Sequence, residues 1–334
     1  MEYRQFGRSG LYVSPLAFGT WRFDRADPDD RARLVNAALD AGVNLIDTAP
    51  AYGAGQAEEW LGGILAERGK PESYVLATKC SGPRPRAPDG FLCTRKHVIE
   101  SCEKSLRRLR VDCIDLFQLH CAEPLVPIDE SLAALTDLQR AGKIRYSGSS
   151  NFKGWQLVEA CWCAKEYGYG KLISDQSEYH LLDRRLETTN FPPMETYGMK
   201  TLVYSPLSQG LLTGKYVDGP EGTPAGSLHH GRDASAPIFS EELTAPVRQL
   251  VDLSKRYGHA CAAMALAFVI DQRNVGAAII APRTMEQLEE NLAAAEIAVD
   301  DEMRAGFDAI NPPGEKLAGQ RLNLYNHGPT SRWW

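Results

Sequence analysis

The alternation of short apolar runs with amphipathic helical stretches is the sequence feature that most constrains this fold. Most of the apolar runs begin roughly 30 residues after the previous one, which is the length of one strand–helix unit. Between them apolar residues recur at helical spacing, and two of the predicted helices open on a capping residue, Thr94 or Asp129. The predicted strands are residues 15–20, 44–49, 74–79, 114–120, 146–151, 173–179, 201–206 and 277–282. The clearest predicted helices are residues 29–42, 57–69, 94–110 and 129–142.

Eight strands alternating with helices predict one closed (β/α)₈ barrel, a TIM barrel, over residues 1–334. A doubly wound sheet is the alternative, but it needs a glycine-rich dinucleotide turn after its first strand, and no GxGxxG occurs in the chain. The opening segment YRQFGRSGLYVS has Gly10 between two β-prone runs, so we expect an N-terminal hairpin that closes the barrel bottom. The long connection at 208–240 is predicted to be a functional loop, and the C-terminal tail, 312–334, has no clear helical period.

The composition is that of a globular protein and excludes several kinds of partner. Hydrophobic residues make up 43% of the chain and charged residues 24%. With 37 basic against 43 acidic residues, the chain lacks the broad positive field that nucleic acid requires, so we expect no nucleic-acid partner. The longest strongly apolar run, residues 260–270, is about half of what spans a bilayer, so we expect no membrane segment. The absence of a secretory signal and eight cysteines without a CxxC pair favour a cytoplasmic protein.

Four polar residues lie where successive predicted strands end. Asp47 is at the end of the second strand and Tyr52 in the loop that follows it, while Lys79 closes the third strand and His120 the fourth. The chemistry of such barrels takes place at the C-terminal ends of the strands, so we expect these side chains to converge at the barrel mouth.

Together these residue types suit reversible carbonyl reduction. A tyrosine hydroxyl titrates near pH 10 in water, and a nearby lysine ammonium lowers that pKa by favouring the phenolate. Asp47 would hold Lys79 charged, and His120 would orient the carbonyl oxygen while Tyr52 acts as the general acid or base. No side chain donates hydride, so a nicotinamide cofactor is implied.

The chain resembles the aldo-keto reductases along essentially its whole length. The matching stretches are FGTW (18–21), AGVNLIDTAPAYG (41–53), ATK (77–79), QLH (118–120), GKIRYSGSSNF (142–152), QSEYHLLDR (176–184), YSPLSQGLLTGKY (204–216) and PRTMEQLEENL (282–292). The resemblance implies a barrel oxidoreductase that acts on carbonyls or alcohols. It also places the family's catalytic set on Asp47, Tyr52, Lys79 and His120.

The resemblance further implies an extended NADPH across the barrel mouth. It assigns contacts with the nicotinamide end to Ser150, Asn151 and Gln176, with Tyr204 under the ring and Thr20, Trp21 and Asp47 beside it. It assigns the pyrophosphate to Ser205, Pro206, Leu207 and Lys215, the ribose 2′-phosphate to Arg283, and the adenosine end to Gln287, Glu290 and Asn291. Pro282 stands where small residues are more usual, so NADPH is the expected cofactor and NADH a second possibility.

The substrate is expected to be a small aldehyde, ketone or sugar. Trp21, Phe23 and His120 are predicted to contact it, since aromatic walls suit rings. The loops 80–93, 121–127 and 208–240 and the tail should shape the pocket, with further aromatic residues available from Tyr325, Trp333 and Trp334.

Two other functions stay open at this stage. One is a cofactor-binding regulatory subunit that resembles the barrel subunits of potassium channels, although those carry a different residue at the position of His120. The other is a metal-dependent barrel hydrolase, but no cluster of His and carboxylate residues follows the strands. His229 and His230 are adjacent and have Asp233 nearby, but a metal site needs a further ligand at a suitable spacing. We therefore predict no metal site. The physiological substrate, the working direction and the oligomeric state are not defined by the sequence.

Overall fold

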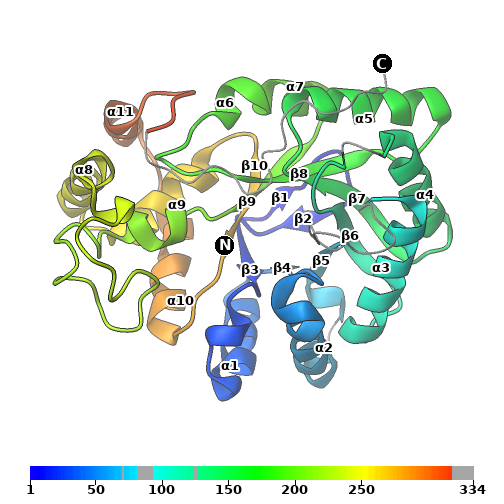
Figure 1. Ribbon diagram of the computed structural model, residues 1–334, viewed down its shortest axis with the longest axis horizontal. Helices are drawn as coiled ribbons and strands as arrows, with labels where there is room; N and C mark the ends of the chain where they lie inside the picture. The colour runs from blue at the N-terminus through cyan, green and yellow to red at the C-terminus, as the bar shows by residue number, and fades with distance from the viewer. Residues whose placement is uncertain (70, 81–92, 124–125, 318–334) are drawn as a thin grey trace.

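The computed structural model describes residues 1–69, 71–80, 93–123 and 126–317. Its centre is a closed barrel of parallel strands in the order β10-β3-β4-β5-β6-β7-β8-β9 (Figure 1). The strands are β3 (Leu16–Gly19), β4 (Leu45–Asp47), β5 (Val75–Lys79), β6 (Ile114–Leu119), β7 (Ile144–Ser150), β8 (Leu172–Glu178), β9 (Lys200–Tyr204) and β10 (Val275–Ile280). Each overlaps the run predicted for it, and the predicted (β/α)₈ barrel is confirmed.

The helices form a ring around the barrel (Figure 1). They are α1 (Pro28–Asp40), α2 (Gln56–Arg68), α3 (Arg95–Leu109), α4 (Ile128–Arg140), α5 (Gly154–Tyr167), α6 (Leu186–Thr189), α7 (Phe191–Tyr197), α8 (Glu241–Tyr257), α9 (Cys261–Asp271), α10 (Met285–Leu292) and α11 (Asp301–Ile310). Thr94 caps α3 as predicted, because its hydroxyl accepts a hydrogen bond from the His97 N–H at 3.2 Å. The cap predicted at Asp129 is wrong, because α4 begins at Ile128, directly after Pro127. The Asp129 carboxylate therefore lies in the first turn, where its negative charge interacts favourably with the helix dipole.

The predicted N-terminal hairpin is present and closes one end of the barrel. Its strands, β1 (Arg4–Gln5) and β2 (Tyr12–Val13), pair antiparallel. Phe6 and Val13 are buried in a cluster with the inward residues of the barrel: Ala17, Leu45, Val75, Ala77, Leu116, Ile173, Leu202 and Ala277. The approach is close, since a Cβ atom at Gly276 would lie 2.3 Å from the Phe6 ring. The hairpin therefore supplies the bottom layer of the core.

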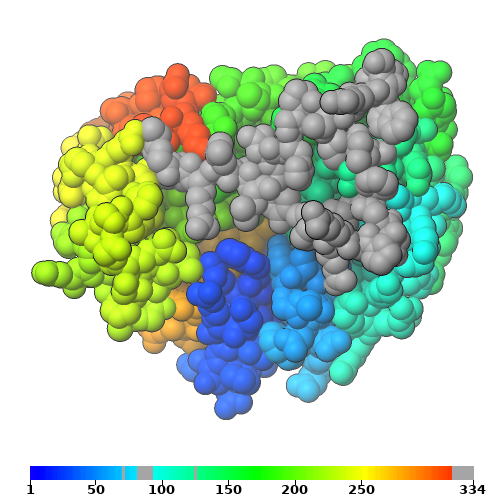
Figure 2. All heavy atoms as spheres, in the orientation of Figure 1, coloured from blue at the N-terminus to red at the C-terminus, as the bar shows by residue number. Residues whose placement is uncertain are grey.

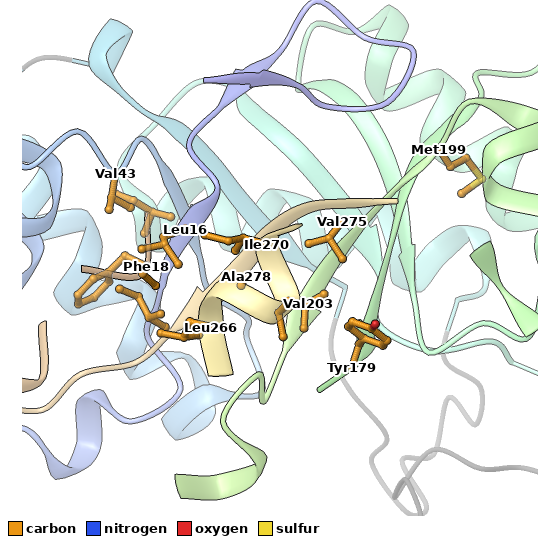
Figure 3. Close-up of a cluster of buried hydrophobic side chains, with 14 of the residues drawn as sticks. Leu16, Phe18, Val43, Tyr179, Met199, Val203, Leu266, Ile270, Val275 and Ala278 are labelled. Atoms are coloured by element: carbon orange, nitrogen blue, oxygen red, sulfur yellow. The ribbon is translucent and has the colours of Figure 1, made fainter. Parts of the chain in front are cut away.

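A second apolar cluster joins the outer surface of the barrel to the helices. Figure 3 shows one part of it, where Leu16 and Phe18 of β3 and Ala278 of β10 lie beside Leu266 of α9. Neighbouring residues of one strand thus face opposite ways, which is the period of two that the strand geometry requires.

The long connection at 208–240 joins β9 to α8 and packs against α8 and α9. It contains two short 3₁₀ turns, η4 (Ser208–Thr213) and η5 (Pro237–Phe239). Tyr216 and His229 are buried within it, with ring centroids 5.1 Å apart in an edge-to-face contact. In Figure 2 the segment lies beside the N-terminal part of the chain, coloured dark blue.

Several sequence expectations fall on residues outside the part of the chain that the structure describes. These are most of the predicted specificity loop, at 81–92, and the tail residues Tyr325, Trp333 and Trp334. All eight cysteines are described as free thiols. Within the described ranges, none of the helices has the length and apolar character needed to cross a bilayer.

Candidate active site

The strand register brings the predicted catalytic residues to one end of the barrel. Asp47 is the last residue of β4, opposite Gly19 of β3 and Ala77 of β5. Lys79 is the last residue of β5 and lies opposite Gln118 of β6. Because all these strands are parallel, their carboxyl ends open at the same mouth.

A buried ion pair forms the centre of the site. The Lys79 ammonium nitrogen lies 2.6 Å from the Asp47 Oδ2 and 2.9 Å from the Thr48 carbonyl oxygen, and both charged side chains are buried. Its third contact is the hydroxyl of Tyr52, at 3.1 Å. Burial alone would lower the pKa of Lys79, but the Asp47 carboxylate and the Tyr52 oxygen outweigh it and raise that pKa. The site therefore holds a permanent cation against the Tyr52 hydroxyl.

A tight turn carries Tyr52 to this position. It spans Tyr52–Gly55, and its backbone is left-handed at three successive residues, with φ of 57° at Gly53, 55° at Ala54 and 99° at Gly55. Glycine adopts this conformation readily, whereas Ala54 is held in it by its neighbours. The chain then enters α2 directly, so the ring of Tyr52 is fixed between a strand end and a helix start.

The His120 ring makes an edge-to-face contact with the Tyr52 ring. The two ring centroids are 6.3 Å apart, with the ring planes at 84°. Burial lowers the pKa of His120 to about 3, and the Lys79 ammonium acts in the same direction, while a hydrogen bond with the Cys80 carbonyl opposes it. The imidazole is therefore neutral at physiological pH.

Four of the residues predicted at the nicotinamide end of the cofactor lie together beside Asp47. Ser150 of β7 pairs with Gln176 of β8 in the register, and its hydroxyl donates to the Gln176 carbonyl at 2.9 Å. The Gln176 amide donates to the Asp47 Oδ1 at 2.8 Å. The Tyr204 hydroxyl donates to the Asn151 Oδ1 at 2.9 Å. The Asn151 amide also donates to the Ser150 hydroxyl at 2.9 Å, so these four residues and Asp47 belong to one hydrogen-bonded network.

The residues predicted to bind the phosphates lie at the rim formed by the segment after β9 and the start of α10. Lys215 is half-buried, and its pKa is lowered by burial and by the nearby Arg283, with Glu290 opposing. Arg283 donates to the Gly226 carbonyl at 2.9 Å, and its own N–H donates to Gln287 Oε1 at 2.9 Å. Thr284 caps α10, so the N-terminus of that helix faces the same place.

The remaining predicted residues have diverse settings. Thr20 is buried and its hydroxyl donates to that of Thr48 at 2.8 Å. Trp21 is 50% exposed, which leaves its ring open to a ligand, whereas Phe23 is buried against Phe18 with ring centroids 6.0 Å apart. A contact of Phe23 with substrate stays a prediction. Ser205, directly after β9, has a left-handed backbone. Pro206 and Asn291 are buried, and Leu207 packs against the apolar cluster between the barrel and the helices.

Sequence reasoning missed several residues that complete the site. The Gln118 amide donates to Asp47 at 3.4 Å. Gln118 lies two residues before His120, which directly follows β6, and this spacing was a usable signal for it. Glu58 of α2 supports the same strand end from the helix-facing side of β5, where it accepts hydrogen bonds from Thr78 at 2.7 Å and Arg108 at 2.7 Å. These contacts join distant segments, so no local pattern predicts them.

Arg22 is a further addition at the rim. It stacks on Trp21, with its guanidinium carbon 3.9 Å from the ring centroid, and its pKa is lowered by burial and by neighbouring cations that include Arg283. Arg22, Lys215 and Arg283 therefore form a group of cations at the phosphate end of the predicted cofactor site. Among the described residues, no three His, Cys, Asp or Glu side chains are grouped as a metal site would require.

This fold and this mouth define a barrel oxidoreductase, and the comparisons with known proteins agree. Residues 15–312 match the Aldo/keto reductase family, and the chain belongs to it. It is 36% identical over 330 residues to the uncharacterized oxidoreductase YrpG of Bacillus subtilis, covering 94% of this chain and 97% of that protein. It is 36% identical to the aldo-keto reductase YhdN of the same organism, in a match that covers 86% of this chain and 87% of YhdN. It is 31% identical to protein tas of Escherichia coli, in a match that covers 93% of this chain and 98% of that protein.

Proposed function

We propose that this member of the family reduces small aldehydes, ketones or sugar carbonyls, or oxidises the matching alcohols, with NADP(H) as the hydride carrier. The observation that carries the proposal is the buried Lys79 ammonium, which contacts the Asp47 carboxylate at 2.6 Å and the Tyr52 hydroxyl at 3.1 Å. A cation in that place stabilises a phenolate, so the hydroxyl becomes a better proton donor to a carbonyl oxygen.

The roles of the side chains follow from these contacts. When bound, a nicotinamide cofactor would supply the hydride for the carbonyl carbon. Tyr52 gives its hydroxyl proton to the carbonyl oxygen, and Lys79 compensates the negative charge that is left on Tyr52. Asp47 keeps Lys79 charged, and the Gln118 and Gln176 amides hold Asp47 in turn.

His120 orients the substrate carbonyl beside Tyr52. It is neutral, since burial lowers its pKa to about 3, and a neutral imidazole has one N–H. The ring hydrogen-bonds the Cys80 carbonyl, so donation to a substrate oxygen requires the other tautomer.

The residues at the rim fit a phosphorylated dinucleotide. Arg22, Lys215 and Arg283 converge near the N-terminus of α10, a donor set that suits phosphate oxygens. We propose that Arg283 binds the ribose 2′-phosphate and makes NADPH the preferred cofactor. Loss of a charge-assisted bond in Arg283→Ala should then weaken NADPH by about 10- to 100-fold and leave NADH nearly unaffected. Equal Kd values for NADPH and NADH in the wild type would refute this preference.

The test of the activity follows nicotinamide absorbance with a panel of aldehydes, ketones and sugars. Turnover should fall by about 10²–10⁴-fold in Tyr52→Phe, the contribution of a positioned general acid, while the Kd of NADPH stays unchanged. A wild type that binds NADPH tightly and reduces nothing would contradict the proposal and favour a regulatory, cofactor-sensing subunit.

A further inference from the structure

Two buried cysteines lie in contact directly behind the catalytic residues. Cys80 follows Lys79 at the end of β5, and Cys93 precedes Thr94, the cap of α3. Their sulfur atoms are 3.9 Å apart, and the two residues are 0% and 3% exposed. None of the roles given above to the site's residues uses either thiol.

The surroundings hold the pair in place from several elements. The Cys80 N–H donates to the Gln118 carbonyl of β6 at 2.9 Å. The Cys93 carbonyl accepts from the Ser131 hydroxyl of α4 at 2.6 Å, and the Cys93 sulfur lies 3.3 Å from the Cys121 carbonyl oxygen. Cys93 also has a left-handed backbone, with φ of 67°, which a residue other than glycine keeps only when its contacts impose it.

The two thiols differ in how readily they lose a proton. The two sulfurs are in hydrogen-bonding contact, in which either thiol can be the donor, and this contact lowers the pKa of Cys80 against the opposing effect of burial. The same contact, together with burial, raises the pKa of Cys93 well above its ordinary value. Of the two thiols, Cys80 therefore ionises more readily, which favours it as the nucleophile.

We propose that Cys80 and Cys93 are a redox-active pair that peroxide converts to a disulfide, a modification site in the wall of the active site. Both sulfurs are buried, which favours an oxidant as small as peroxide over a peptide disulfide. Cys80 thiolate attacks one peroxide oxygen, so that an S–O bond forms, the O–O bond breaks and water leaves after taking a proton. Cys93 then attacks the Cys80 sulfur, the S–S bond forms, and the S–O bond breaks to release a second water. Each sulfur is oxidised by one electron, and peroxide is reduced by two.

The disulfide would disturb the catalytic residues through Cys80. Its sulfurs must close from 3.9 Å to about 2.05 Å, so the backbone at Cys80 or Cys93 has to move. Cys80 is bonded to Lys79, and its carbonyl hydrogen-bonds the His120 ring. We expect a loss of turnover of about 10- to 100-fold, as displacements near 1 Å produce in active sites. This consequence rests on the proposed reductase activity, whereas the disulfide itself does not.

The modification is tested by mass, independently of activity. The whole protein is treated with hydrogen peroxide, alkylated and digested with trypsin without reduction. The expected product joins peptide 80–86 to peptide 87–95, is about 2 Da lighter than the sum of the two thiol peptides, and separates with dithiothreitol. Two results would overturn the pairing. One is a disulfide that joins peptide 87–95 to peptide 111–140 through Cys121, and the other is oxidation of Cys80 and Cys93 to sulfinic acids without any disulfide between them.

Single variants complete the test. Cys93→Ser should keep the turnover of the reduced wild type and lose its sensitivity to peroxide, while the matched control Cys113→Ser should keep both the link and the sensitivity. A link formed without any loss of turnover would overturn the coupling to His120. If the wild type proves to have no reductase activity, the peptide link still decides whether the pair exists.

Discussion

The two ends of the barrel are built from the same strands, yet opposite kinds of side chain fill them. Next to the hairpin the inward residues are apolar and buried: Leu45, Val75 and Leu116. Farther along the same rows they are polar and buried: Asp47, Lys79 and Gln118. Because side chains alternate with a period of two, the inward-facing residues of one strand include both apolar core residues and, nearer its carboxyl end, the polar residues of the site. The closed end supplies rigidity, and the open end uses it to hold a buried ion pair.

Removing the cation of the buried ion pair at the polar end should have the largest effect on stability. Lys79→Met leaves the Asp47 carboxylate buried without its cation, which should cost about 3–5 kcal/mol in the free energy of unfolding measured with urea. The double variant Lys79→Met/Asp47→Asn is the matched control and should recover much of that loss, because no buried charge remains. A single variant as stable as the wild type would contradict the tight pairing.

Breaking the apolar end should lower stability and spare the chemistry. Leu116→Ala removes a fully buried side chain from the inner cluster, and we expect a loss of about 2–5 kcal/mol in the free energy of unfolding. The Kd of NADPH and the turnover of the folded fraction should not change, and the volume-conserving Leu116→Met should cost less than about 1.5 kcal/mol. If turnover falls as much in Leu116→Ala as in Lys79→Met, the two ends are not separable in function.

A buried carboxylate that faces away from the barrel interior, Asp175, sharpens the comparison. Asp175 lies on β8 and accepts hydrogen bonds from the hydroxyls of Ser149 and Ser177, and burial raises its pKa to about 7 in spite of them. The folded state then binds a proton more tightly than the unfolded state, so this residue's contribution to stability is present below about pH 4 and is lost as the pH rises through 7.

The free energy of unfolding should therefore decline between pH 5 and pH 8 more steeply in the wild type than in Asp175→Asn, with a difference on the order of 1–3 kcal/mol. Chemical denaturation at a series of pH values measures it. Parallel stability profiles for the two proteins would show that Asp175 is ionised in the folded state throughout.

Much of this arrangement follows from sequence because barrel geometry is regular. Strand spacing predicted the barrel, and strand ends predicted that Asp47, Lys79 and His120 meet, since parallel strands open at one face. Local patterns did not predict contacts between distant segments, such as the support of Asp47 by Gln176 or the approach of Cys93 to Cys80. The misplaced cap at Asp129 has a different cause: acidic residues favour both the cap and the first turn, so composition alone does not separate the two.

The central claim is that the buried ammonium of Lys79 promotes ionisation of the Tyr52 hydroxyl. It is tested most directly by NMR titration of protein labelled at the tyrosine ζ-carbons, with the Tyr52 signal assigned by its absence from Tyr52→Phe. The account predicts that Tyr52 ionises at a clearly lower pH in the wild type than in the folded double variant Lys79→Met/Asp47→Asn. The same titration midpoint in both proteins would contradict it.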